Sequence, residues 1–296
     1  MGLTPYNNRN SITFLHRYRV FNGYKNYQEQ NRFFPASAYR TMHAQHDSVP
    51  EALKVHSSRD FESYKIFELR LKYFVHKRIE LNAFLPVLNN KSKTDDVYEQ
   101  YTGFGDVSLN AGFHLILPDE EKEIKQKLVA GAGIKLPTGN FYAHDSRSQR
   151  LPFEMQPGTG STDGFVYVNY IVMYRKLGIN MNANFKLNGT NRYHERVGNS
   201  STDFVSLFYK VKAGNVFLYP SVQANYEFTK GVYTKGIVQP STAMSVLMLG
   251  PGLDVFYKSF SVNAAWQFTT LEKILPGDLE SAGRLSLGLN YNFGGK

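Results

Sequence analysis

Charged side chains recur at alternate positions in the first half of the chain, and they are the residues whose types and spacing could support chemistry. Alternate residues of a β-strand point to the same face, so such charges would gather on one face of neighbouring strands. In the lumen of a barrel they could select an anionic or polar solute. They could equally form a network of salt bridges and hydrogen bonds that braces a narrow barrel, which is the interpretation we favour. The candidate lumen residues are Arg17, Arg19, Glu68, Arg70, Lys72, Arg78, Glu80, Asp106, Lys127 and Lys135.

Two other groups of residues give only weak indications of chemistry. His43 and His46, in MHAQH, could form a metal pair, but no carboxylate or cysteine accompanies them at a fixed spacing. Residues 194–201 contain a His, a Glu and two Ser residues, which a hydrolase would need, but no nucleophile motif surrounds them. We therefore expect no catalytic residues, no metal site and no cofactor, and we do not expect an enzyme.

Composition excludes several further classes of protein. The 296 residues include no cysteine, which rules out a disulfide framework, a thiolate zinc site and a cysteine nucleophile. The formal charge of +9 comes from scattered basic residues, a pattern that argues against a nucleic-acid partner. No stretch of about eighteen apolar residues occurs, so a membrane protein with this sequence would have to be a β-barrel. The first ten residues lack the apolar segment of a signal peptide, so we expect a mature or truncated chain.

Period-two alternation runs through the sequence and predicts an all-β chain. In residues 67–73 every odd position is Phe, Leu or Tyr, and every even position is Glu, Arg or Lys. Residues 78–85 repeat the pattern after a short VHK segment, which predicts a hairpin. His16 falls at an apolar position of the first strand, so either it lies at the membrane interface or that strand is displaced by one residue.

About twelve such segments occur, most of them ten residues or longer. A tilted strand of about nine to eleven residues crosses a bilayer. The predicted strands are Ile12–Phe21, Tyr64–Phe74, Arg78–Leu88, Gly103–Leu117, Gln126–Pro137, Gly164–Tyr174, Leu177–Asn188, Asp203–Lys212, Val216–Phe228, Ala243–Tyr257, Phe260–Thr270 and Arg284–Phe293.

The connections between these strands alternate between short and long. Outer-membrane barrels have an even number of strands, short periplasmic turns and longer extracellular loops. We therefore predict one transmembrane, antiparallel, up-and-down β-barrel domain over residues 1–296, with residues 22–63 as a long first extracellular loop. The other predicted long loops are residues 89–102, 138–163, 189–202, 229–242 and 271–283.

The polar faces of several strands are uncharged, which distinguishes a lumen from a surface facing bulk water. Asn180, Asn182 and Asn184 alternate with apolar residues, and Ser261 and Asn263 do the same. Tyr and Phe residues also cluster near strand ends, as the interfacial girdles of membrane barrels do. These features favour a membrane barrel, with lipid as its outer partner, over a soluble sandwich.

The last strand, RLSLGLNYNF, resembles the C-terminal signal that the barrel-assembly machinery reads in bacterial outer-membrane proteins. Ser286, Gly288, Tyr291 and Phe293 have its spacing, although Gly294, Gly295 and Lys296 follow where a terminal Phe is usual. The resemblance implies location in the bacterial outer membrane and contact with that machinery during assembly.

Three further segments, GFGDVSLNAGFHLIL, VAGAGIKLPTGNF and GPGLDVFY, resemble the outer-membrane transporter family associated with phenol-degradation (MetA-pathway) operons. The resemblance covers most of residues 103–293, and FELRLKYFVHKRIELNAFLP is similar to variants from Bacteroidota envelopes. It implies a passive channel for small solutes, hydrophobic or aromatic compounds among them. The alternative is a structural or docking subunit of an envelope complex, in which the first loop contacts another envelope protein.

Overall fold

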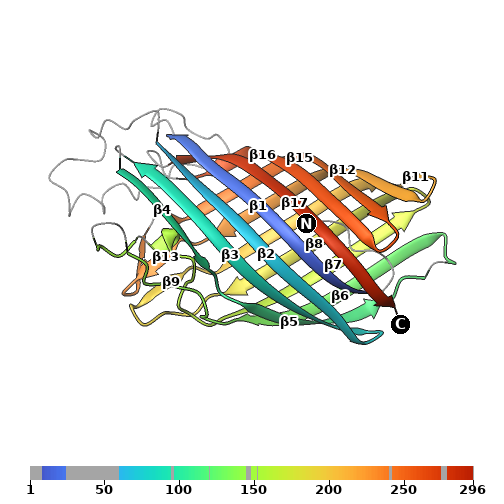
Figure 1. The fold of residues 1–296 in the computed structure, drawn as a ribbon, viewed down its shortest axis with the longest axis horizontal. Helices are drawn as coiled ribbons and strands as arrows, with labels where there is room; N and C mark the ends of the chain where they lie inside the picture. The colour runs from blue at the N-terminus through green and yellow to red at the C-terminus, as the bar shows by residue number, and fades with distance from the viewer. Residues whose placement is uncertain are drawn as a thin grey trace.

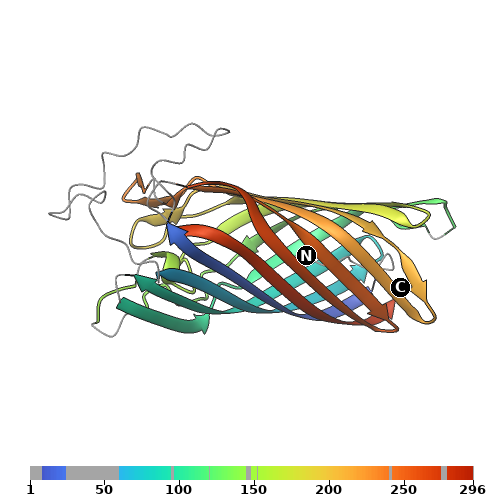
Figure 2. The same cartoon turned by 90° about the horizontal axis from the view of Figure 1, so that it is seen from above.

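Strands account for most of the computed structural model, which describes residues 9–24, 60–94, 97–119, 121–144, 148–151, 153–239, 242–274 and 279–295. Twelve of the described strands form a closed antiparallel barrel (Figure 1). They are strongly tilted from the long axis (Figure 2). The barrel strands are β1 (Arg9–Tyr24), β2 (Phe61–His76), β3 (Ile79–Thr94), β5 (Ser108–Ile116), β6 (Ile124–Lys135), β7 (Asp163–Tyr174), β8 (Leu177–Leu187), β10 (Ser200–Tyr209), β12 (Val216–Thr229), β15 (Met244–Tyr257), β16 (Phe260–Lys273) and β17 (Leu279–Gly295).

The barrel closes between its first and last strands. β1 pairs with β17 from Arg9, opposite Gly295, to Tyr24, opposite Leu279. Each remaining strand pairs with its neighbours in the sequence, including β10 with β12. Connections at the end near Arg9 are short, with two-residue turns at 77–78, 175–176 and 258–259. The predicted up-and-down topology is confirmed: the first and last strands pair with each other, and the short turns lie at one end.

Two predicted strands are wrong as single elements. In place of Gly103–Leu117, β4 (Val97–Phe104) pairs with the outer end of β3, and β5 begins only at Ser108. Asp106 lies in the break, where its carboxylate contacts the ammonium group of Lys135 instead of continuing a ladder. The predicted strand Asp203–Lys212 likewise divides into β10 and β11 (Val211–Ala213).

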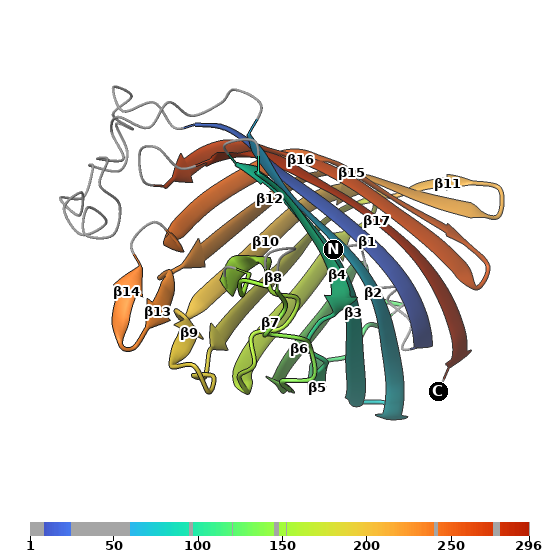
Figure 3. The same cartoon turned by 60° about the vertical axis from the view of Figure 1, so that its left-hand side comes forward.

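Several predicted loops contain strands. Strands β3 and β4 enter the predicted loop 89–102, and β16 and β17 enter 271–283. Strands β9 (Glu195–Val197), β13 (Val232–Thr234) and β14 (Ile237–Gln239) form a separate three-stranded sheet at the long-loop end (Figure 3). A strand that extends beyond the bilayer does not need an apolar outer face. These segments are therefore polar in composition, and the sequence predicted them to be loops.

The two faces of the barrel wall have opposite chemistry. On β16 and β17 the outward positions are apolar and exposed, as at Trp266, Phe268, Leu285, Leu287 and Leu289. Inward positions are polar and buried, and they include many of the buried Asn, Ser and Gln side chains. A soluble protein has apolar residues inside and polar residues outside, whereas a membrane barrel has apolar residues outside and polar residues inside.

The position of His16 settles the register of the first strand. Ser11, Thr13, Leu15 and Arg17 line the internal cavity, so the even-numbered residues of β1 point outward. The imidazole of His16 stacks on the outward ring of Phe67, with ring centroids 4.5 Å apart. The predicted register is therefore correct, and His16 lies on the outer face.

Within the described residues, no helix has both the length and the apolar composition needed to span a membrane. The 3-10 helix η3 (Phe153–Met155) has three residues.

The barrel lumen as the candidate functional site

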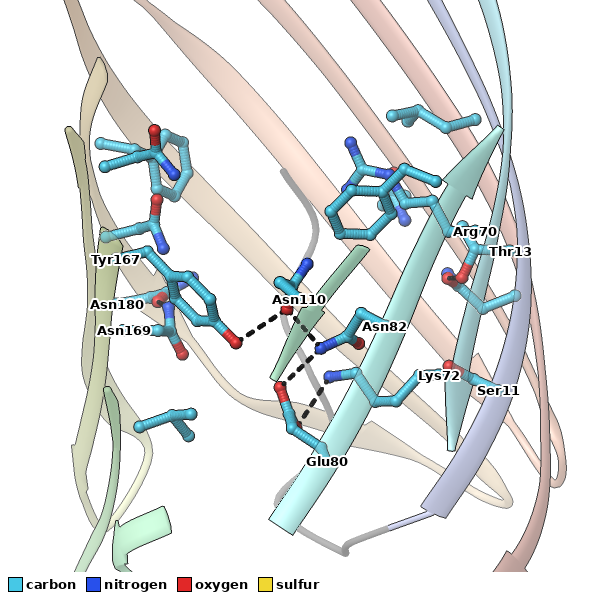
Figure 4. Close-up of a pocket in the computed structure, with 18 of the residues that line it drawn as sticks. Ser11, Thr13, Arg70, Lys72, Glu80, Asn82, Asn110, Tyr167, Asn169 and Asn180 are labelled. Carbon is cyan, nitrogen blue, oxygen red and sulfur yellow. Dashed lines mark hydrogen bonds and ion pairs between the residues drawn. The ribbon is translucent and has the colours of Figure 1, made fainter. Parts of the chain in front are cut away.

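A cavity of about 420 Å³ lies inside the barrel. Side chains of every barrel strand except β15 line it, so the whole wall shapes it. The lining combines amides and hydroxyls, six Arg or Lys side chains with two Glu side chains, and a few aromatic rings. Figure 4 shows part of it, including Arg70, Lys72 and Glu80. Its cations are Arg9, Arg17, Arg70, Lys72, Lys127 and Arg284, and its anions are Glu80 and Glu227.

Asparagine is the commonest polar residue of the lining. Asn180, Asn182 and Asn184 follow one another on the inward row of β8, as predicted for a lumen face. Asn169 of β7 donates to Asn180 across the ladder at 3.1 Å. An amide carries both donors and acceptors, so this wall is polar without a net charge. The other lining asparagines are Asn82, Asn110, Asn225, Asn263, Asn290 and Asn292.

Two aromatic rings of β7 lie inside the barrel, in space that glycines of β6 leave open. Gly131 and Gly133 lie on the inward row of β6, and a Cβ atom at either position would meet the ring of Tyr167 or Phe165. Both rings line the cavity, together with Phe74, Phe84 and Phe204. The two glycines therefore let bulky rings lie against the strand, which is a structural use of their missing side chains.

Nearest the short-turn end, Glu80 of β3 is the centre of a polar network. Its carboxylate lies 3.3 Å from Lys72 Nζ and 3.0 Å from His114 Nε2. Lys127 of β6 also acts on it electrostatically. A chain of hydrogen bonds continues from Glu80 through Asn82 and Asn110 to Tyr167 (Figure 4). The network connects β2, β3, β5, β6 and β7 across the lumen, as a brace would.

Further along the lumen, two pairs of arginines each share one carboxylate. Arg17 of β1 contacts Glu68 at 3.5 Å, and Arg70 bonds the other oxygen of the same carboxylate. Glu227 of β12 lies 2.6 Å from Arg19 Nη1 and 2.5 Å from Arg284 Nη1. We call these six residues the two Arg–Glu–Arg clusters. They connect β1 with β2 and with β12 and β17.

At the long-loop end, four charged groups attach a loop to the wall. Lys135 Nζ lies 2.5 Å from Asp106 and 2.9 Å from Asp163, and Lys186 lies 2.9 Å from Asp163. Asp106 also accepts hydrogen bonds from the backbone amides of Gly139 and Thr159. Asp106, which lies where the predicted strand breaks, therefore anchors the connection formed by residues 136–162.

The structure separates the ten predicted lumen residues into four groups. Arg17, Arg70, Lys72, Glu80 and Lys127 line the cavity. Arg19 and Glu68 complete the two Arg–Glu–Arg clusters. Asp106 and Lys135 hold the loop anchor. Arg78 lies in the turn between β2 and β3, where its guanidinium donates to the backbone carbonyl of His114 at 2.9 Å.

Sequence reasoning missed Glu227, Arg284, Asp163 and Lys186. Each has a signal in the alternation pattern: Glu227 shares the inward parity of Asn225, and Arg284 shares that of Ser286. Asp163 shares the inward parity of Phe165 on β7. Lys186 follows Asn184 on the same row. The register of β1 on β17 could not be read from alternation alone, so the position of Arg19 opposite Arg284 was not predicted.

Outside the membrane-spanning part, Arg150 and Glu195 join two long loops. The guanidinium of Arg150 makes two hydrogen bonds to the Glu195 carboxylate, at 2.6 and 2.8 Å. Burial raises the pKa of Glu195, but hydrogen bonds from Arg150 and Asn191 outweigh it and leave the pKa below its ordinary value. The hydrogen bond to Glu195 raises the pKa of Arg150.

Neither of the weak chemical indications is strengthened by the structure. The carboxylate of Glu195 is occupied by Arg150 and Asn191. Among the described residues, no group of three or more His, Asp or Glu could hold a metal ion. His43 and His46 lie outside the described residues.

Comparison with known proteins relates this barrel to solved structures. No protein-family model and no curated protein sequence matches the chain. The COG4313 outer membrane channel from Pseudomonas putida F1 superposes with a TM-score of 0.69 at 14% identity, over 99% of this chain and 100% of that one. The chain has the fold of bacterial outer-membrane β-barrels. The transport unit of the autotransporter AIDA-I from Escherichia coli is also similar, with a TM-score of 0.50 at 11% identity, over 99% and 93% of the two chains.

Proposed function

We propose that the protein is a passive channel of the bacterial outer membrane, through which small solutes cross by diffusion. The observation that carries this function is the polar cavity inside a closed barrel whose outer face is apolar. Likeness to a solved outer membrane channel over 99% of the chain supports it.

We also propose membership of the family associated with phenol-degradation operons, in a variant like those of Bacteroidota envelopes. The motifs at Gly103, Gly105 and Asp106 and at residues 135–139 support it. In the structure these two segments are in contact, because the amide of Gly139 donates to the carboxylate of Asp106 at 2.9 Å. Membership would make aromatic compounds candidate solutes, and the rings of Phe84, Phe165 and Phe204 in the lining are compatible with them.

Electrical recording from planar bilayers tests the channel. The purified chain is compared with a variant in which a short linker replaces residues 25–59, because β1 and β2 pair up to Asn22 and Phe61 without that segment. Current steps in the intact protein would establish a channel. Silence of both proteins would contradict the proposal and would favour a docking subunit, whose partners a native pull-down from membranes would then recover.

We further propose that β17 is recognised by the barrel-assembly machinery. Tyr291 and Phe293 are exposed on its outer face, with their rings stacked 5.9 Å apart between centroids. Ser286 lines the cavity, and Gly288 lies against Asn263 of β16. The signal residues thus combine an aromatic outer row with small residues on the inner row.

A further inference from the structure

The two Arg–Glu–Arg clusters set four guanidinium groups against two carboxylates. Guanidinium groups stay charged throughout the physiological pH range. Arg17 also lies within electrostatic range of Arg284 and Glu227, so the two clusters influence each other. This part of the lumen therefore carries an excess of positive charge, and that charge does not depend on the titration of any lysine.

Arg17 is the member of these clusters that is best placed to bind a solute. It contacts Glu68 only at 3.5 Å, whereas Arg70 holds the same carboxylate more closely. Its side chain is 33% exposed and lines the cavity, whereas the side chain of Glu68 is 9% exposed. An anion could therefore bind Arg17 while Glu68 keeps its bond to Arg70, so no buried carboxylate would be left unpaired.

The rest of the lining suits an organic anion. The wall of β7 and β8 offers the amides of Asn169, Asn180, Asn182 and Asn184. The two carboxylates among the described lining residues, Glu80 and Glu227, are each paired with cations. The guanidinium of Arg70 lies 5.1 Å from the centre of the Phe84 ring, so a cationic and an apolar surface adjoin each other. A carboxylate binds guanidinium groups through charge-assisted hydrogen bonds, and an attached ring would complement the aromatic side chains.

We infer that the lumen selects small organic anions of the carboxylate class and that Arg17 is the residue that binds the carboxylate. This inference rests on the proposed channel and names its class of solute. It gives the two Arg–Glu–Arg clusters a function in solute selection, in addition to the bracing that the hydrogen-bond networks provide.

Ion selectivity of the reconstituted channel tests the inference. Reversal potentials across a gradient of KCl give the permeability ratio of chloride to potassium for the intact protein, Arg17→Gln, Glu68→Gln and the control Arg175→Gln. Arg175 lies in the exposed turn between β7 and β8, pairs with Glu123, and is not among the described residues that line the cavity. We expect anion preference in the intact protein, a ratio closer to unity in Arg17→Gln, a higher ratio in Glu68→Gln, and no change in the control. A cation-preferring channel, or one indifferent to Arg17, would overturn the inference and leave the channel standing.

Equilibrium binding separates the inference from the channel itself. Benzoate and its uncharged analogue benzamide are titrated into each detergent-solubilised protein, with heat-modifiable migration on gels as the check of folding. Benzoate should bind more tightly than benzamide, and Arg17→Gln should weaken benzoate about tenfold, because one charge-assisted hydrogen bond is lost. Benzoate binding without current steps would support the site and overturn the channel. Equal binding of the two compounds would overturn the site.

Discussion

Lys135 shows how much of this barrel depends on single buried charges. Its ammonium group lies between the carboxylates of Asp106 and Asp163, and the side chains of all three are less than 10% exposed. A buried charge that loses its partner retains the cost of its desolvation. The anchor of the 136–162 connection should therefore be sensitive to the loss of one cation.

We expect Lys135→Met to lower the free energy of unfolding by about 3–5 kcal/mol, because two buried carboxylates lose their shared cation. Urea unfolding in lipid vesicles, followed by the fluorescence of Trp266, measures it. Lys122→Met is the matched control, since Lys122 and Asp119 form an exposed pair, and it should change stability by less than about 1 kcal/mol. Equal effects of the two substitutions would show that the buried cluster is not a stabilising anchor.

Glu195 gives a pH dependence to the contact between the two long loops. Its pKa in the folded protein is below the ordinary value of 4.5. The contact with Arg150 is therefore fully present above about pH 4.5 and is lost as the pH falls through the lower folded value. Hydrogen exchange of residues 188–199, corrected for intrinsic rates, should be constant from about pH 8 to pH 5 and rise below that. Glu195→Gln should exchange rapidly at every pH, and a step near neutral pH would contradict the assignment.

Strand β17 combines closure of the barrel with the proposed assembly signal. It pairs with β1 on one side and β16 on the other, so its formation completes the sheet. Phe293 lies on the outer face near the end of β17, where lipid and not the lumen surrounds it. Its role in assembly can therefore be separated from any role in solute passage.

We expect Phe293→Ala to reduce the amount of folded protein in the outer membrane several-fold, while refolding into detergent in vitro stays near that of the intact protein. The reason is that the proposed signal is read through its aromatic residue, whereas the strand pairs through its backbone. Quantitative blots of unheated outer-membrane samples measure the folded fraction, with Phe268→Ala as an outward aromatic control on β16. A loss of equal size in both variants would assign the effect to lipid contact.

The twelve barrel strands could be predicted from sequence because lipid and lumen impose a strict alternation on them. Where that constraint ends, prediction fails: β9, β13 and β14 are three residues long, and they and most of β4 fall in segments that were predicted as loops. The break at Asp106 was missed because Asp106 has the inward parity of Asn110 and His114 on β5, so the strand was taken to continue through it. Phe104 has the same parity but is 75% exposed, which marks the change of face. Parity identified lumen charges on the early strands, such as Arg17, but their partners depend on the pairing of strands far apart in the sequence, as for Arg19 and Glu227.

The whole molecule has an apolar exterior around a polar interior. Its buried apolar side chains form small clusters, such as Ile171, Met173, Phe208 and Tyr219. Hydrophobic burial in water could therefore supply little of its stability, and contact with lipid or detergent must supply the rest.

We expect the urea-denatured chain to recover β-sheet circular dichroism and heat-modifiable migration when it is diluted into detergent micelles, and to aggregate when diluted into buffer alone. The reason is that the apolar side chains on the outer face need lipid or detergent around them before the strands can pair into a closed barrel. Circular dichroism together with analytical ultracentrifugation measures both outcomes. A folded monomer in buffer alone would contradict the assignment of the outer face to lipid.

The pairing of Arg9 with Gly295 places the first residue of β1 beside the last residue of β17, at the short-turn end of the barrel. A short linker could therefore join them and allow a circular permutant that opens at a two-residue turn such as Arg175–Lys176. The ring of strands would be unchanged, but β17 would then lie in the interior of the polypeptide and β7 would become its last strand. Such a permutant would ask whether a cell identifies the terminal strand by its residues or by its place in the order of synthesis.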